Sequence, residues 1–360
     1  MTRANRGVAL ISALLIAAVV ASIAALLVSR QQYAIAGVSQ LRRESAAVRL
    51  MQMLELSAME LLQLDSQTGP ADSLIDLWAK QKMTGNLEGL EGAATLRDAQ
   101  RLFNLSNLAL DPGLGAVSAA VVDGDGQPAA AGAGDLMLRS VCAAAGVSLR
   151  GSPQKLGAPP PPLNPQQVAT ARFVLLLRAL EIEPKIVPAI LDWLDPDQDT
   201  SFPNGAEDDY YSKLNPPYRT ADRRFADPSE LLKVRGITPA IYAKLRPYVT
   251  VLDQPTAINV NTAPPAVLMS LSPAIDAATA KMLVEIRTAQ PFMDPASFAA
   301  NPLFAGRPLL IQGVATSSNT FELRADLSSD GASVRYLSLI RRNNANDYRL
   351  VGRERRYGQD

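Results

Sequence analysis

VALISALLIAAVVASIAALLV, residues 8–28, is an uncharged run of 21 residues, and it decides the first element of this fold. At about 1.5 Å per residue, a helix of this length spans roughly 30 Å, which matches the hydrocarbon core of a bilayer. The basic leader MTRANRG precedes the run, and Arg30 closes it. The sequence therefore predicts a single transmembrane helix over 8–28, with residues 1–7 as a separate leader.

Two simpler interpretations of this N-terminus compete. A cleaved secretory signal has an apolar region of about 7–15 residues followed at once by a small-x-small site. Here the apolar run is longer, and the small residues at 34–37 come only after Arg30. A plain membrane anchor fits the length but does not account for the abrupt boundary between Arg6 and Gly7.

The helical pattern continues beyond the apolar run. No proline occurs between residue 8 and Pro70, and Gly37 is the only glycine between residues 8 and 65. Residues 41–64 mix apolar and charged positions at helical spacing. A helix over 8–64 would be roughly 85 Å long, so we expect its outer half to pack on a small sheet. The positions assigned to that packed face are Leu41, Val48, Leu54, Ala58, Leu61 and Leu62.

The composition excludes several kinds of active site. The chain has no histidine and a single cysteine, so Ser-His-Asp, Cys-His and His-zinc sites and an intrachain disulfide cannot form. Cys142, within SVCAAAGV, is predicted to be a small buried apolar residue. The 35 Lys and Arg residues balance the 35 Asp and Glu residues, so no net field attracts nucleic acid. We predict that the protein is not an enzyme.

The rest of the chain divides into segments that differ in composition and in the pattern of apolar residues. Glycines break 77–110 into turns and short strands, and 111–163 is rich in Ala, Gly and Pro. Within that second region we expect a loop or linker, with DGDG at 123–126 as a turn and a helix only over Asp135–Ala145. Asn164 and Pro165 then begin a helix as its N-cap and first turn.

In residues 321–356, apolar and polar side chains alternate, and the segments SSDG and NNAND interrupt this alternation. Two turn clusters between runs of period two predict an antiparallel meander of three strands. The predicted fold class is α+β: a long N-terminal helix packed on a small antiparallel sheet, with a large inserted α-helical domain. The core would comprise 29–110 and 301–360, and the insertion 111–300.

Residues 192–209, DWLDPDQDTSFPNGAEDD, hold seven acidic residues and no basic ones. Such a run is either a solvated loop or a site neutralised by a cation. The D-x-D-x-D spacing of Asp195, Asp197 and Asp199 directs successive oxygens into one concavity, as hard cations require. The loop is not an EF-hand, because Thr200 and Ala206 occupy the positions that need Gly and Glu.

Two segments, 227–249 and 258–298, have the texture of helix-hairpin-helix elements, with Val234-Arg235-Gly236-Ile237 as the strongest match. They resemble the DNA-binding repeat of competence proteins, in which backbone N–H groups contact a phosphate. The alternative function is therefore a membrane-anchored periplasmic DNA receptor. The second hairpin lacks the glycine, and residues 226–300 hold six basic and six acidic residues, a net charge of zero. Nucleic acid is therefore not expected as a partner.

Taken together, the leader and anchor, FNLSNL at 103–108, DWLD…GAEDDYY, INVNTAP and the closing strands resemble the minor pseudopilin K family of type II secretion systems. This resemblance implies cleavage by prepilin peptidase between Gly7 and Val8 and N-methylation of Val8. It also implies that Ser12, the fifth residue after the cut, occupies the position where most pilin-class subunits carry a glutamate. A subunit without that buried carboxylate suits a terminal position.

The family resemblance further implies a structural calcium site. The ligand roles carried over fall on Asp195, Asp197, Glu207 and Asp208, and less securely on Asp199 and Asp209. The expected function is a tip complex of the periplasmic pseudopilus with minor pseudopilins I and J. The resemblance also suggests contacts with the major pseudopilin, the secretin and the secreted substrate. The expected location is the bacterial inner membrane, single-pass, with a cytoplasmic N-terminus and a periplasmic C-terminal domain.

Overall fold

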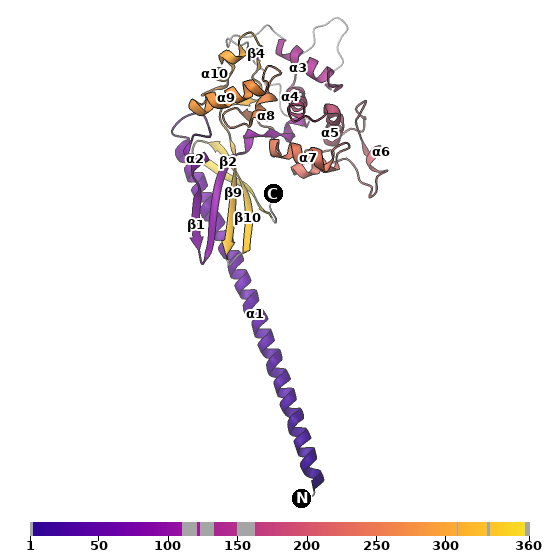
Figure 1. Ribbon diagram of the computed structural model, residues 1–360, viewed down its shortest axis with the longest axis vertical. Helices are drawn as coiled ribbons and strands as arrows, with labels where there is room; N and C mark the ends of the chain where they lie inside the picture. The colour runs from indigo at the N-terminus through magenta and orange to yellow at the C-terminus, as the bar shows by residue number, and fades with distance from the viewer. Residues whose placement is uncertain are drawn as a thin grey trace.

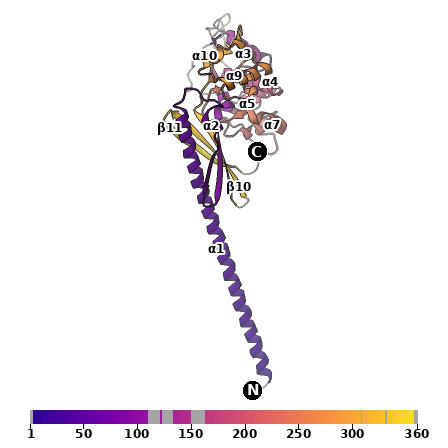
Figure 2. The ribbon, with the colours of Figure 1, turned by 60° about the vertical axis from the view of Figure 1, so that its left-hand side comes forward.

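The computed structural model describes residues 3–109, 121–122, 133–149, 163–307, 309–329 and 332–356. One helix, α1 (Arg3–Asp65), leads from the N-terminus into a body made of a sheet and many short helices (Figure 1). Figure 2 shows the helical part at the end of the sheet that lies farther from the N-terminus. The DGDG turn predicted at 123–126 lies outside the described residues.

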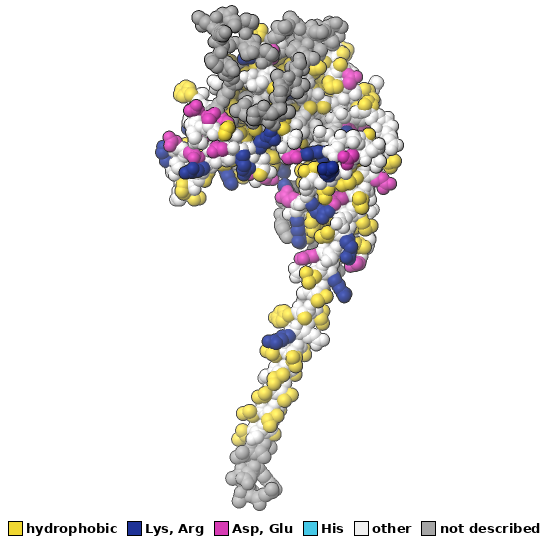
Figure 3. Space-filling model, turned by 180° about the vertical axis from the view of Figure 1, so that it is seen from behind, with side chains coloured by type: hydrophobic (Ala, Val, Ile, Leu, Met, Phe, Trp, Pro, Cys, Tyr) yellow, Lys and Arg dark blue, Asp and Glu magenta, His cyan; other side chains and the backbone are white. Residues whose placement is uncertain are grey.

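The 63 residues of α1 confirm the predicted unbroken helix. The first half of α1, which we call the stem, is not covered by the rest of the chain. Its large apolar side chains, such as Leu15, Ile23 and Leu27, are exposed. Figure 3 shows mostly hydrophobic side chains along this stem. Its most apolar window has a mean hydropathy of 2.8 and is not buried by the rest of the chain. Among the described residues, this is the one helix whose length and composition suit a membrane span.

The second half of α1 packs on the sheet, and the side chains that it buries there include Leu54, Ala58 and Leu62. The prediction that Leu41 and Val48 share this packed face is wrong, because they are 64% and 42% exposed. Leu41 precedes the part of α1 that the sheet covers. Val48 is about 200° around the helix from the buried residue Leu50, and so faces away from the sheet.

The sheet is antiparallel and has the strand order β1-β2-β9-β10-β11. The predicted meander is confirmed as β9, β10 and β11, and the glycine-broken segment supplies β1 and β2. Register fixes the join between the early and late strands, with Leu96 opposite Leu323. The bounds are β1 (Met83–Leu87), β2 (Leu90–Asp98), β9 (Thr320–Ser329), β10 (Ala332–Asn344) and β11 (Asp347–Arg356).

The helical part lies in the chain between β2 and β9. The predicted start of a helix at Asn164 is confirmed, because Asn164 and Gln167 form a reciprocal capping box. The helix expected over Asp135–Ala145 is present as α3 (Ala133–Ala143). The helices are α2 (Leu77–Lys80), α3, α4 (Pro165–Ala179), α5 (Val187–Leu194), α6 (Asp208–Tyr211), α7 (Pro239–Leu245), α8 (Pro265–Met269), α9 (Ala277–Ala289) and α10 (Pro295–Ala299).

Short elements connect these helices. The 3₁₀ turns are η1 (Ala99–Arg101), η2 (Leu105–Leu108), η3 (Pro184–Ile186), η4 (Pro228–Lys233), η5 (Arg246–Tyr248) and η6 (Pro302–Phe304). Two-residue strands form three pairs, β3 (Phe103–Asn104) with β5 (Val249–Thr250), β4 (Val121–Val122) with β7 (Leu309–Leu310), and β6 (Ile258–Asn259) with β8 (Val314–Ala315).

The described residues contain two separate hydrophobic cores. One lies between α1 and the sheet and contains Trp78. The other lies among the helices and contains Trp193. The FNLSNL side chains Phe103, Leu105 and Leu108 belong to the helical core, although they follow β2 directly in the chain. Apolar packing therefore stabilises each part internally.

Candidate functional site

The acidic loop is positioned by the end of α5 and the start of α6. Trp193, at the end of α5, is buried and packs edge-on against Tyr211 of α6, with 5.2 Å between ring centroids. Asp195 follows in extended conformation and ends α5, as expected for a residue that precedes proline. The aromatic contact therefore fixes the two ends of the loop, while residues 196–200 between them are exposed.

The loop brings three of the predicted ligands together. One carboxylate oxygen each from Asp195, Asp197 and Glu207 lie within 4.8 Å of one another. Asp195 and Glu207 are buried, whereas Asp197 is exposed to solvent. Oxygen atoms at this spacing can all contact one ion at a Ca²⁺–O distance of about 2.4 Å.

The carboxyl group of Glu207 is buried and has a raised pKa. It is 2% exposed, and neither side-chain oxygen has a hydrogen-bond partner in the described part of the chain. Burial raises its pKa to about 8, and the negative charges of Asp192, Asp195, Asp197 and Asp222 add to the increase. Buried carboxyl oxygens without hydrogen bonds are costly, and a bound cation would remove that cost.

The other predicted ligands lie apart from this group. Asp208 accepts hydrogen bonds from the backbone N–H and the hydroxyl of Thr220, both at 3.0 Å. Asp199 and Asp209 are exposed.

Two carboxylates that raise the pKa of Glu207, those of Asp192 and Asp222, were not predicted from the sequence. Asp192 is completely buried and accepts a hydrogen bond from the Ser201 backbone at 3.0 Å. A side chain at Gly205 would lie 2.1 Å from Asp192 Oδ2, so the loop can wind this closely only around glycine. Asp222 comes 15 residues after Glu207 and belongs to no local motif that could have marked it.

The first hairpin contacts the acidic loop directly. The backbone N–H of Arg235 donates to the Tyr211 hydroxyl at 3.1 Å, and its guanidinium donates to the Gly205 carbonyl at 2.9 Å. The same guanidinium stacks over the Tyr210 ring, 4.7 Å from the centroid. Gly236 adopts a positive φ of 83°, which turns the chain here. In this structure the hairpin therefore holds the acidic loop in place.

The second hairpin region is formed by α8 and α9. Ser272 lies in the turn between them, where its hydroxyl accepts from the Ala274 backbone at 3.1 Å. Asp276 caps α9 through the Thr279 backbone at 2.7 Å. Arg287 of α9 is buried and donates to the Val260 carbonyl at 2.5 Å, so this cation also serves an internal contact.

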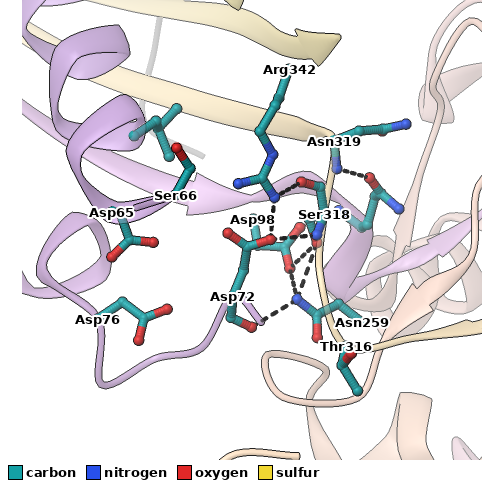
Figure 4. Close-up of polar contacts among 12 residues, drawn as sticks. Asp65, Ser66, Asp72, Asp76, Asp98, Asn259, Thr316, Ser318, Asn319 and Arg342 are labelled. Carbon is teal, nitrogen blue, oxygen red and sulfur yellow. Dashed lines mark hydrogen bonds and ion pairs between the residues drawn. The ribbon is translucent and has the colours of Figure 1, made fainter. Parts of the chain in front are cut away.

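A buried polar seam joins the helical part to the sheet (Figure 4). Asp98 ends β2 and is buried, and its Oδ2 accepts hydrogen bonds from Asn259 at 3.0 Å, Thr262 at 2.5 Å and Ser318 at 2.7 Å. Its Oδ1 accepts from the Gln100 backbone at 2.8 Å. Gln100 follows β2, Ser318 precedes β9, and Asn259 and Thr262 lie in the helical part between them, so a single carboxylate joins both connections to the helical part.

Asp72 extends the seam toward α1. Its Oδ2 accepts from the Ser318 backbone at 2.6 Å and forms an ion pair with Arg342 of β10. Burial raises the pKa of Asp72, and it raises the pKa of Asp98 to about 6. Hydrogen bonds and the Arg342 guanidinium therefore stabilise these two buried carboxyl groups in surroundings of low dielectric constant.

The predicted processing residues lie near the start of the stem. Gly7 and Val8 lie within the continuous helix α1. Ser12 lies one turn further along and is exposed. Its hydroxyl carries no charge, so it cannot form the ion pair that a glutamate would form there.

Comparison with known proteins assigns a family. Family models described as type II secretion system (T2SS), protein K, match residues 102–254 and 258–317. Type II secretion system protein K of Dickeya chrysanthemi is 31% identical over 273 residues, which cover 74% of this chain and 71% of that protein. The protein of the same name from Klebsiella pneumoniae is 28% identical over 316 residues, covering 84% and 81%.

A solved structure shares the fold. The chain resembles one in the crystal structure of the GspK-GspI-GspJ complex from the enterotoxigenic Escherichia coli type 2 secretion system. The TM-score is 0.64 with 23% identity, and the match covers 89% of this chain and 99% of the other.

Proposed function

The chain belongs to the type II secretion system protein K family, and from this premise we propose that it caps the tip of the periplasmic pseudopilus with minor pseudopilins I and J. In that position it would support protein secretion across the outer membrane. The family and the fold support a structural pseudopilin role rather than an enzymatic one. The observation that carries the proposal is α1, one helix whose first half is an exposed apolar stem and whose second half is part of the folded core.

The proposed orientation follows from the stem. Arg3 and Arg6 precede the apolar run, and positive residues favour the cytoplasmic side of a bacterial inner membrane. The folded body would then lie in the periplasm after a single crossing. Prepilin peptidase would cut between Gly7 and Val8, and Val8 would be N-methylated. The major pseudopilin, the secretin and the secreted protein are the further proposed partners.

The proposed tip position rests on Ser12. A carboxylate at the corresponding position of a neighbouring stem would need a positive partner, because an unpaired charge in the bilayer is costly. Ser12 has no carboxylate and so offers no such ion pair to a subunit above it, which leaves addition of a further subunit on top without that stabilisation. Growth would therefore proceed from below, with this chain at the end.

We also propose that the acidic loop binds calcium. The donor set fits, since Asp195, Asp197 and Glu207 gather three oxygens within 4.8 Å. Glu207 has buried oxygens without hydrogen bonds in the described part of the chain, and a bound cation would neutralise them. Calcium would neutralise the loop and stabilise its packed conformation. Asp199, Asp208 and Asp209 stay predicted ligands that would have to move closer.

The alternative function as a DNA receptor is not favoured. A phosphate-binding hairpin presents its backbone N–H groups to the ligand. Here the Arg235 N–H donates to Tyr211, and its guanidinium contacts Gly205 and Tyr210. These contacts support a packing role for the hairpin.

A secretion assay tests the proposed function. A type II secretion strain that lacks its own protein K and carries the genes of this chain's own system should release the secreted protein into the medium only when the full chain is supplied. When the supplied chain lacks residues 8–28, the secreted protein should stay in the periplasm. Equal secretion with and without the full chain would refute the proposal.

A further inference from the structure

Arg235 lies between two buried residues at the turn of the first hairpin. Val234 and Ile237 belong to the helical core, whereas Arg235 is exposed. The Ile237 backbone N–H donates to the Val234 carbonyl at 3.1 Å, which closes the turn, and a side chain at Gly236 would come within 3.3 Å of Ile186. The helical core therefore fixes the backbone from which the Arg235 side chain extends.

The contacts of Arg235 fall on both sides of Glu207 in the chain. Its guanidinium donates to the carbonyl of Gly205, two residues before Glu207, at 2.9 Å. The same guanidinium stacks over the ring of Tyr210, three residues after Glu207, with 4.7 Å to the centroid. The Arg235 backbone N–H donates to the hydroxyl of Tyr211 at 3.1 Å. One residue of the hairpin therefore holds both flanks of the segment that presents the Glu207 carboxylate.

These contacts matter because the three grouped carboxylates come from two separate parts of the acidic loop. Asp195 and Asp197 lie at the end of α5, whereas Glu207 stands directly before α6, ten residues after Asp197. Residues 198–200 between them are exposed. Contacts from outside this exposed stretch therefore help to hold the two parts together, and those of Arg235 come from a different element of the helical part.

The charge of Arg235 and its contacts predict opposite effects on a bound cation. A guanidinium repels a Ca²⁺ ion, so loss of its charge alone would tighten calcium binding. Loss of its contacts would leave residues 205–211 freer before binding, and the cost of ordering them would weaken calcium binding. The guanidinium contacts a carbonyl and an aromatic ring, which favours the second effect.

We propose that Arg235 is a positioning residue of the calcium site, which holds the Glu207 carboxylate close to those of Asp195 and Asp197 and thereby couples calcium binding to the order of the hairpin at 227–249. This inference rests on the proposed calcium site. Coupling between two equilibria is reciprocal, so a hairpin that strengthens calcium binding is itself held more firmly when calcium is bound. The hairpin then serves cation binding through its arginine.

Calorimetric calcium titrations of the full-length chain in detergent test this inference. Arg235→Ala removes both side-chain contacts, and Arg235→Lys keeps the charge but lacks the planar guanidinium. The control is Arg219→Ala, which removes an equal charge beside the same loop, since the Arg219 guanidinium is exposed and lies 3.6 Å from the Asp208 carboxylate. We expect at least fivefold weaker calcium binding for Arg235→Ala, at least twofold weaker binding for Arg235→Lys, and binding within twofold of the wild type for the control.

Hydrogen exchange provides a second readout, which a general loss of stability would not reproduce. Calcium should slow amide exchange across residues 234–245 in the wild type and leave it unchanged in Arg235→Ala. Because the Arg235 side chain is exposed, the melting temperature of Arg235→Ala without calcium should stay within about 4 °C of the wild type. If it falls further, the calcium affinity of Arg235→Lys decides, and an affinity equal to that of the wild type overturns the inference.

The other outcomes separate this inference from the proposed calcium site. If the wild type binds calcium and Arg235→Ala binds it within twofold or more tightly, the inference is overturned while the calcium site stands. If calcium does not slow exchange in the hairpin of the wild type, the coupling is refuted in the same way. If the wild type binds no calcium, both proposals are refuted.

Discussion

Replacement of Asp98 by alanine should uncouple the two cores of this protein. Asp98 accepts four hydrogen bonds, from Gln100, Asn259, Thr262 and Ser318, and it is 2% exposed. The three side-chain donors are also buried. In the variant they would face a cavity or a trapped water where the carboxylate was.

The expected cost follows from these contacts. Each buried donor left without an acceptor costs about 1–3 kcal/mol, and part of this is recovered because Asn259 and Thr262 have other acceptors. We therefore expect a loss of about 3 kcal/mol in the free energy of unfolding at pH 6. For a folded unit of this size this corresponds to a fall of roughly 6–12 °C in melting temperature.

The two tryptophans allow each core to be monitored separately. Trp78 lies in the core between α1 and the sheet, and Trp193 lies in the helical core. Neither indole N–H has a hydrogen-bond partner among the described residues, so replacement of one by phenylalanine removes no hydrogen bond. In each single-tryptophan background, fluorescence during thermal unfolding then reports one core of the full chain in detergent.

The wild type should show coincident transitions at the two tryptophans, since the seam makes unfolding cooperative. Asp98→Ala should separate them by at least 5 °C. The matched control is Asp326→Ala, which removes an exposed carboxylate of the sheet and should cost under about 1 kcal/mol. Coincident transitions in Asp98→Ala, at the wild-type temperature, would show that the seam does not couple the cores.

Three further predictions concern the titration of Asp98 and the carboxylates of Glu207 and Glu55. Burial raises the pKa of Asp98 to about 6 from an ordinary 3.8. The contribution of Asp98 to the free energy of unfolding is therefore complete below pH 4 and declines as the pH rises through 6. In denaturant titrations, the unfolding free energy of the wild type relative to Asp98→Asn should fall by about 1 kcal/mol from pH 5 to pH 7. Glu207→Gln should weaken calcium binding at least tenfold by calorimetry and abolish the melting shift caused by a chelator, and calcium binding equal to that of the wild type would contradict its role as a ligand. Glu55→Gln should cost about 3 kcal/mol, because it leaves Arg353 of β11 without its buried carboxylate, and a melting temperature within 2 °C of the wild type would contradict that assignment.

Much of the fold could be predicted because its signals are local. The stem needs only an unbroken apolar run and the absence of proline, and the meander needs only alternation and two turn clusters. The start at Asn164 needs only a cap and a following proline. The grouping of Asp195, Asp197 and Glu207 is also local, since one short loop contains all three.

The remaining features depend on contacts that are distant in the chain. Asp98 meets Asn259 and Ser318 only after the insertion has folded, and no periodicity marks such a pairing. Leu41 has suitable helical spacing but lies below the sheet, and the extent of the sheet along α1 is a tertiary property. Asp222 lies outside the acidic loop in the chain, yet its negative charge contributes to the raised pKa of Glu207.

The position of this chain in the filament tests the central claim most directly. Pseudopili are sheared from cells that express the complete secretion system, and gold-labelled antibody against the helical part is imaged on them. If this chain caps the pseudopilus, we expect gold at one end of each filament and bare sides. Gold distributed along the filaments, or filaments without gold while the chain remains in the membrane, would contradict it.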